Sequence, residues 1–160
     1  MSLADRAAAS HTIHQGHGPL PDAEIIERHA EAFVHGFVER EAWVSLLVWR
    51  GTVSGRRRFR ARLAEPLPLA AGRRVDVTAR GERFALEAMR RLGAPEACVL
   101  VKDGLLEDEL TTLQSALHRA YLSGSGALVS AVPGRLCFVQ SADGTRQILY
   151  RPRETSPASR

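Results

Sequence analysis

Apolar side chains recur at helical spacing in three stretches of the chain. In the first stretch, residues 22–41, the apolar positions are four, three and four residues apart, and Asp22 is placed to cap the helix N-terminus. In the third stretch, residues 103–122, the apolar positions are again three or four residues apart, and the second, residues 82–92, is a shorter stretch with apolar residues two or three positions apart. The third begins with acidic residues that suit the positive end of a helix dipole, namely Asp103, Glu107, Asp108 and Glu109. The pattern therefore predicts three amphipathic helices.

Shorter apolar or alternating runs predict about seven strands, over residues 43–49, 56–63, 74–79, 97–101, 127–132, 135–140 and 146–150. Residues 97–101 are continuously apolar, which indicates an interior strand. The turn pairs Pro133-Gly134 and Asp143-Gly144 separate the last three runs, so we expect a C-terminal three-strand antiparallel meander. The strand, helix and strand over residues 97–132 are compatible with a right-handed βαβ crossover.

These elements together predict one α+β domain over residues 22–150. We expect a mixed, mainly antiparallel sheet of about seven strands, with the three helices packed mostly on one face. Residues 1–21 are rich in Ala, Ser, Gly and His and predict a mobile N-terminal arm, and residues 151–160 predict a flexible C-terminal tail. The N-terminal stretch has no apolar signal segment, which favours a cytoplasmic, bacterial-type protein.

The segment from Arg56 to Arg62 is the most informative one for function. If Ser54-Gly55 forms a two-residue hairpin turn, one face of the hairpin carries Trp43, Ser45, Leu47, Trp49, Arg58, Arg60 and Arg62. Phe59 and Leu63 then face the core. A looser turn over residues 51–55 shifts the register by one residue and moves Trp49 to the side of Phe59. The register therefore decides whether a surface of tryptophan and arginine exists.

The charge distribution along the chain draws further attention to this segment. The net charge is +4, but residues 1–49 carry −4, residues 50–91 carry +8 and residues 92–160 are neutral. Such a basic block either attracts an acidic partner or a polyanion, or lies beside the acidic first helix and is neutralised within the fold. Both interpretations remain open from the sequence.

Motifs for metal, cofactor or nucleophilic chemistry are weak. His11, His14 and His17 have metal-compatible residue types, but the glycine-flanked arm lacks the rigid second shell of a metal site, so we expect neither a metal nor a cofactor. Cys98 and Cys137 lie in apolar runs and are expected to be small buried hydrophobes. The chain also lacks a Walker A motif, a nucleophile elbow, a His-Glu-x-x-His motif and an apolar run long enough to span a membrane.

These observations favour a non-enzymatic cytoplasmic binding or accessory module that engages an acidic protein surface through the arginine-rich hairpin. The candidate binding residues are Trp43, Trp49, Arg56, Arg58, Arg60 and Arg62. RNA or single-stranded DNA is the alternative partner, because arginines that grip phosphates beside stacking aromatic rings are typical of single-strand binders. A small enzyme with an unrecognised pocket is the third hypothesis. The oligomeric state is not predicted.

Overall fold

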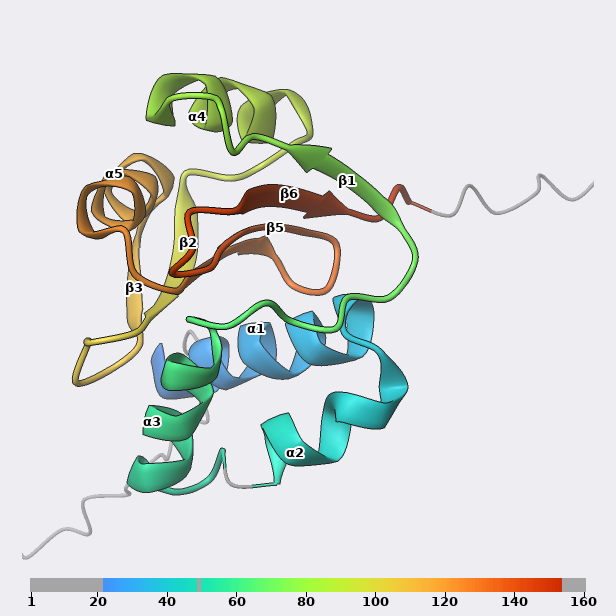
Figure 1. Ribbon diagram of the computed structural model, residues 1–160, viewed down its shortest axis with the longest axis vertical. Helices are drawn as coiled ribbons and strands as arrows, with labels where there is room; N and C mark the ends of the chain where they lie inside the picture. The colour runs from blue at the N-terminus through green and yellow to red at the C-terminus, as the bar shows by residue number, and fades with distance from the viewer. Residues whose placement is uncertain (1–21, 49, 154–160) are drawn as a thin grey trace, which may run out of the picture.

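The computed structural model describes residues 22–48 and 50–153. They form three layers, in which one antiparallel sheet lies between two layers of helices (Figure 1). The strands are β1 (Arg73–Asp76), β2 (Ala97–Lys102), β3 (Glu109–Thr112), β4 (Ala127–Val132), β5 (Leu136–Gln140) and β6 (Arg146–Tyr150), in the order β1-β6-β5-β4-β2-β3. The helices are α1 (Asp22–Phe37), the 3₁₀ helix η1 (Arg40–Ala42), α2 (Trp43–Leu47), α3 (Val53–Arg62), α4 (Glu82–Arg91) and α5 (Leu113–Ser123). Helices α1 to α3 cover one face, and α4 and α5 cover the other.

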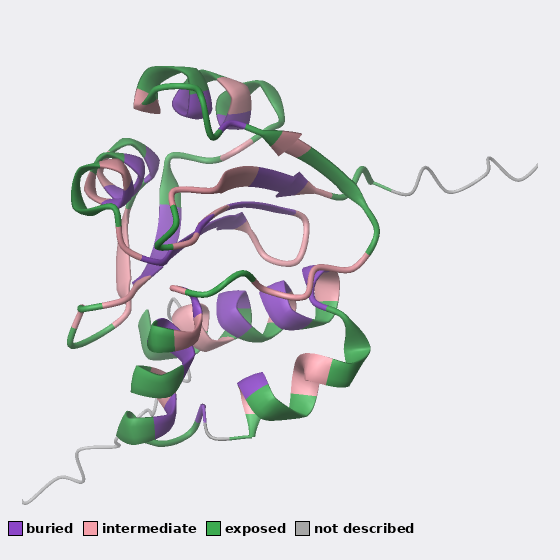
Figure 2. Ribbon diagram, viewed as in Figure 1, coloured by how far each residue is buried: buried purple, intermediate pink, exposed green. Residues whose placement is uncertain are grey.

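The central strands are apolar on both sides because each face of the sheet carries its own core. In β2, Cys98 and Leu100 pack with α4 and α5, while Val99 and Val101 pack with α1 and α3. Successive side chains of a strand point to opposite faces, so a strand covered on both sides has no polar alternation. Figure 2 shows the resulting buried middle layer between helices whose outer surfaces are exposed.

Several of the predicted elements are confirmed. The meander is present, with β4 paired antiparallel to β5 and β5 to β6. The first helix, the short helix at 82–91 and the strands at 73–76 and 97–102 also lie where the sequence predicts them. The domain is α+β, and residues of α1 and of the C-terminal meander pack together in the core on one face of the sheet.

The predicted arginine-rich hairpin is wrong, because both of its strands are helices. Thr52 is the N-cap of α3 and accepts a hydrogen bond from the backbone N–H of Gly55 at 3.0 Å, so Ser54-Gly55 is the first turn of a helix. The buried residues Gly55, Phe59 and Leu63 are four apart and share one helix face. The same residues also satisfy an alternating strand pattern, which is why a short run does not distinguish the two.

The helix predicted over residues 103–122 begins only at Leu113. Gly104 has a φ of +86°, which interrupts any helix there, and the four acidic residues lie in the β2–β3 connection and at the start of β3. Thr112 caps α5 by accepting from the N–H of Ser115 at 3.2 Å. The predicted βαβ crossover is also wrong, because β2 and β4 are antiparallel neighbours.

The described residues hold six strands and five α-helices where the sequence predicts about seven and three. The sheet is antiparallel throughout, and the helices lie on both faces. The predicted arm at 1–21, Trp49 and residues 154–160 of the predicted tail lie outside the described residues. Among the described helices, none has both the length and the apolar character needed to cross a lipid bilayer.

The connection between α3 and β1 crosses the sheet on the side of α1, and residues 63–70 of it are called the strap below (Figure 1). Backbone hydrogen bonds hold it in place: Glu39 N–H donates to Pro68 O, and Ala70 N–H donates to Phe37 O, both at 2.8 Å. A third bond, from Ala142 N–H to Ala64 O at 2.9 Å, anchors its start to the β5–β6 turn. The strap is therefore a fixed wall over the sheet.

Candidate functional site

The residues predicted to form one binding face are dispersed by the helices that replace the hairpin. Trp43 is half-buried; its indole Nε1 donates to the backbone oxygen of Val38 at 2.8 Å, and its ring meets His35 edge-on with centres 4.7 Å apart. Trp49 lies outside the described residues. The described tryptophan is therefore part of the packing of α1 against η1 and α2.

The four predicted arginines fall on different sides of α3. Arg56 donates to the backbone oxygen of Arg50 at 3.2 Å, and Arg62 pairs with Glu65 at 2.9 Å. Arg60 is buried, whereas Arg58 is exposed and bonds to no other described residue. Only Arg58 of this set is thus left for recognition in the part of the chain that the structure describes.

Arg60 belongs to a network of four charges, three of them buried and the fourth, Glu27, partly exposed. Its Nη1 donates to Asp108 at 2.9 Å, and Arg50 donates to the other oxygen of Asp108 at 3.1 Å and to Glu27 at 2.7 Å. The side chains of Arg50, Arg60 and Asp108 are only 3%, 4% and 2% exposed. Two positive and two negative groups balance, so these two arginines are neutralised within the fold, although only Arg50 contacts the acidic first helix and Arg60 pairs with Asp108 instead.

This network is a structural clamp between α1, α3 and the β2–β3 connection. Arg60 also donates to the backbone oxygen of Leu106 at 3.0 Å, and the Arg50 guanidinium lies 4.5 Å from the ring centre of Phe59. Burying charges is costly unless each is paired, and Arg50 Nη1 and Arg60 Nε are buried without a described partner. Of the acidic residues at 107–109, Asp108 therefore belongs to the clamp, whereas Glu109 pairs with Arg119.

A second buried polar contact joins α1 to the sheet. His29 Nδ1 and Ser130 Oγ share a hydrogen bond of 2.7 Å, and both residues are buried. Desolvation lowers the pKa of His29 below its ordinary value, and the nearby Arg28 charge lowers it further. Ser130 is 1% exposed in the middle strand β4, so this pair supports packing and not nucleophilic attack on a substrate.

His29 predicts an acid-sensitive step in stability. In the unfolded chain His29 takes up a proton near its ordinary pKa of 6.5, whereas in the folded chain its pKa is lower. The free energy of unfolding is therefore unaffected by His29 above pH 6.5. Below that pH it falls, until the pH reaches the lowered pKa of the folded state. We expect His29→Gln to remove this part of the slope when unfolding by urea is measured between acidic and neutral pH. His118→Gln, at an exposed site, is the control and should retain it; an unchanged slope in the His29 variant would contradict the assignment.

Both cysteines are buried hydrophobes, as the sequence predicts. Cys98 and Cys137 are each 1% exposed and free. Burial raises the pKa of Cys98 to about 12 and raises that of Cys137 well above its ordinary value. Neither thiol is therefore ionised near neutral pH, and neither is placed as a nucleophile. Among the described residues, no group of three or more His, Cys, Asp or Glu side chains is arranged to hold a metal ion.

Unpaired arginines gather instead where β1 begins, β5 begins and β6 ends. Arg73 is the register partner of Tyr150, which also faces Leu136, and Arg151 N–H donates to Arg135 O at 2.8 Å. An open hollow of about 600 Å³ is lined here by Ala71, Gly72, Arg73, Gly134, Arg135, Tyr150, Arg151 and Pro152. These lining residues include three arginines and no acidic residue. Arg73, Arg135, Arg151 and Tyr150 are called the arginine surface below.

The guanidinium groups of the arginine surface are available to a partner. Arg73 and Arg151 are exposed and Arg135 is half-buried. None of the three makes an ion pair or side-chain hydrogen bond with another described residue. Desolvation of exposed arginines is slight, so an incoming carboxylate or phosphate gains a charge-assisted contact at little cost.

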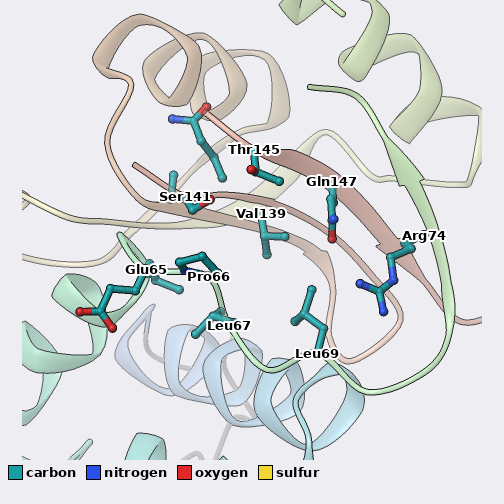
Figure 3. A pocket seen from close by; sticks show the side chains of 12 residues that line it. Glu65, Pro66, Leu67, Leu69, Arg74, Val139, Ser141, Thr145 and Gln147 are labelled. Carbon is teal, nitrogen blue, oxygen red and sulfur yellow. The ribbon is translucent and has the colours of Figure 1, made fainter. Parts of the chain in front are cut away.

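A smaller hollow lies between the strap and the sheet (Figure 3), and its lining includes Arg74, the chain neighbour of Arg73. Its volume is about 120 Å³, and its apolar lining comes from Leu63, Leu67 and Leu69 of the strap and from Ala127 and Val139 of the sheet. Figure 3 shows Val139 directed toward the strap, with Arg74 and Gln147 pointing toward Leu69 at one end. This space is called the apolar hollow below.

Comparison with known proteins does not indicate a function for this chain. No family model, curated protein or solved structure matches this chain. The described part of the molecule offers two hollows for non-covalent recognition, one cationic and one with apolar walls. Its buried Ser–His pair and its thiols are placed for packing.

The arginine surface was missed from the sequence because its members are far apart in the chain. Arg135 directly precedes β5 and Arg151 directly follows β6, and the ends of antiparallel neighbours meet at one edge. The meander was correctly predicted, and the register of its last two strands would have shown that these two arginines are adjacent. Arg73 joins them only through the pairing of β1 with β6, which spans 77 positions from Arg73 to Tyr150.

Proposed function

We propose that this protein is a binding module for an acidic polypeptide, which it recognises on the arginine surface. The observation that carries the proposal is the set of three unpaired arginines around one hollow whose described lining residues include no acidic residue. By contrast, the hollow beside the buried clamp is lined by Arg56 and Arg60 together with Asp22, Glu27, Glu107, Asp108 and Glu109, so its charges are mixed. The net charge of +4 further favours encounter with an acidic partner.

A polypeptide fits this surface better than a single-stranded nucleic acid. Sequence-independent binding of single strands relies on aromatic side chains on which bases stack. Tyr150 is the one aromatic residue in the lining of the described arginine surface, and it packs partly against the core beneath it. Trp43 is engaged with Val38 and His35. The apolar hollow combines aliphatic walls with polar residues such as Arg74 and Gln147, which suits the side chains of a protein.

Removal of the three charges tests the proposal. We expect the Arg73→Gln, Arg135→Gln and Arg151→Gln triple variant to bind fluorescent poly-L-glutamate at least about tenfold more weakly, equivalent to about 1.4 kcal/mol, with a flatter salt dependence. Each lost contact is worth little alone, but three act on one ligand. Fluorescence anisotropy at several salt concentrations measures the effect.

A variant with the same change of charge is the control. The triple variant Arg57→Gln, Arg58→Gln and Arg91→Gln removes from α3 and α4 three exposed arginines that bond to no other described side chain. It should bind poly-L-glutamate nearly as well as the unmodified protein. Equal losses in both triple variants would show attraction to overall charge only and would contradict the assigned surface. Binding of oligothymidylate without binding of poly-L-glutamate would instead favour the nucleic-acid alternative.

A further inference from the structure

The apolar hollow has the size and lining of a site for one aliphatic side chain. Its volume is about 120 Å³, whereas an engineered apolar cavity of about 150 Å³ accommodates benzene. A leucine or valine side chain is therefore of suitable size, and a two-ring indole or purine is too large. Leu63 is buried, and Leu67, Leu69 and Val139 are half-buried, so an inserted side chain meets apolar groups from both walls.

The hollow is preformed by the strap. Pro66 and Pro68 restrict the backbone of this wall, and the bonds from Glu39, Ala70 and Ala142 fix its two ends. The opposite wall is a central part of the sheet, where Val139 lies between Leu128 of β4 and Gln147 of β6. A ligand that enters such a site orders few protein groups, which favours affinity.

Two polar side chains at one end of the apolar hollow, Arg74 and Gln147, indicate which chemical group of a ligand would lie next to the inserted aliphatic side chain. Neither the Arg74 guanidinium nor the Gln147 side-chain amide bonds to another described residue. The nearby carboxylates are already engaged: Glu65 pairs with Arg62 at 2.9 Å, and Asp76 accepts from Thr78 N–H at 2.8 Å. This end of the hollow therefore offers a cation and an amide to a carboxylate.

Other polar groups in the lining are internally bonded. The amide nitrogen of Gln140 donates to the backbone oxygens of Ala120 and Ser125, and its oxygen accepts from Arg146 Nε. Ser141 donates to Asp143 at 2.6 Å. Arg74 and Gln147 are thus the groups best placed to fix the orientation of a ligand.

We propose that the apolar hollow holds an aliphatic side chain of the acidic polypeptide while Arg74 pairs with a neighbouring acidic side chain of the same segment. This inference rests on the proposed function, and it specifies in addition that the acidic partner must contain an aliphatic residue. Arg73 and Arg74 are consecutive on the edge strand β1, one at each hollow. Consecutive side chains of a strand project to opposite faces of the sheet, so a segment lying along the edge of β1 presents alternate side chains to the two faces on which Arg73 and Arg74 lie. The partner motif is a leucine, isoleucine or valine flanked by glutamate or aspartate.

Two synthetic peptides of equal charge test the motif. Both are short runs of glutamate, and one has a central leucine where the other has alanine. We expect the leucine peptide to bind about tenfold more tightly, because burial of a few methylene groups in an apolar pocket gives discrimination of this order. Fluorescence anisotropy with the full chain measures both affinities.

Variants of the protein locate the effect. Val139→Phe and Leu67→Phe fill the hollow from opposite walls, and either one, once its thermal unfolding shows a folded protein, should bring the two peptides to nearly equal affinity. Arg74→Gln should weaken both peptides, whereas Arg91→Gln, an equal change of charge on α4, should not. The Arg73, Arg135 and Arg151 triple variant should weaken both peptides and keep the preference for leucine.

The outcomes separate this inference from the proposed function. If the unmodified protein binds both peptides equally and the triple variant loses both, the arginine surface stands and the aliphatic site is overturned. A leucine preference that survives in both filled variants also overturns it. If neither peptide binds, or if the triple variant binds as well as the unmodified protein, the proposed function itself fails.

Discussion

Asp108→Asn is expected to lower the free energy of unfolding by about 3–5 kcal/mol, as found for buried ion pairs that lose one partner. Asp108 is the only carboxylate paired with Arg60 among the described residues, and it also binds Arg50. The substitution keeps the size of the side chain but leaves the Arg60 guanidinium buried without a counterion. Chemical unfolding monitored by circular dichroism measures the loss.

Two comparisons show whether charge burial is the cause. Glu107→Gln changes an exposed neighbour in the same connection and should alter stability by less than about 0.5 kcal/mol. Arg60→Met should cost less in the Asp108→Asn background than in the unmodified protein, because the uncompensated charge is then removed. Independent, additive effects of the two substitutions would contradict the clamp.

Gly126→Ala is expected to destabilise the protein by about 3 kcal/mol or more, at the upper end of the cost of overpacking. A Cβ atom at this position would lie 2.3 Å from the backbone nitrogen of Ala64 and 2.4 Å from the carbonyl carbon of Leu63. These are backbone atoms at the start of the strap, so a rotamer change does not relieve the clash. Thermal unfolding tests the prediction.

Gly51→Ala is the matched control for Gly126→Ala. Apart from its chain neighbours, no described residue has an atom within 4 Å of a Cβ added to Gly51, so the melting temperature of the Gly51→Ala variant should change little. The strap, which the added methyl group of Gly126→Ala would push away, also forms one wall of the apolar hollow. If Gly126→Ala unfolds like the unmodified protein, then the strap is not held against the β4 end of the sheet.

The meander and the short fourth helix were predictable because their signals are local. The pairs Pro133-Gly134 and Asp143-Gly144 separate three apolar runs, and Gly134 and Gly144 have the positive φ values that such turns use. In α4, Ala85, Leu86 and Met89 are buried at helical spacing. Each of these features depends on residues within one or two turns of the chain.

Residues 43–63 were predicted wrongly because their local pattern fits two structures. Phe59 and Leu63 are buried in either a strand or a helix, and the turn signal at Ser54-Gly55 also fits a helix start after Thr52. What distinguishes the two is the burial of Arg60, whose partner Asp108 is 48 positions away. A single sequence does not show that pairing.

The sequence by itself determined the α+β class, the meander, the burial of both cysteines and the concentration of positive charge, since each follows from composition or from neighbouring residues. Tertiary structure alone decided which arginines remain free. Arg60 is buried against Asp108, whereas Arg73, Arg135 and Arg151 meet at the ends of three strands. The reason is physical: the free energy of an arginine depends on whether the folded chain brings a carboxylate or solvent to it, and that depends on strand pairing over long sequence distances.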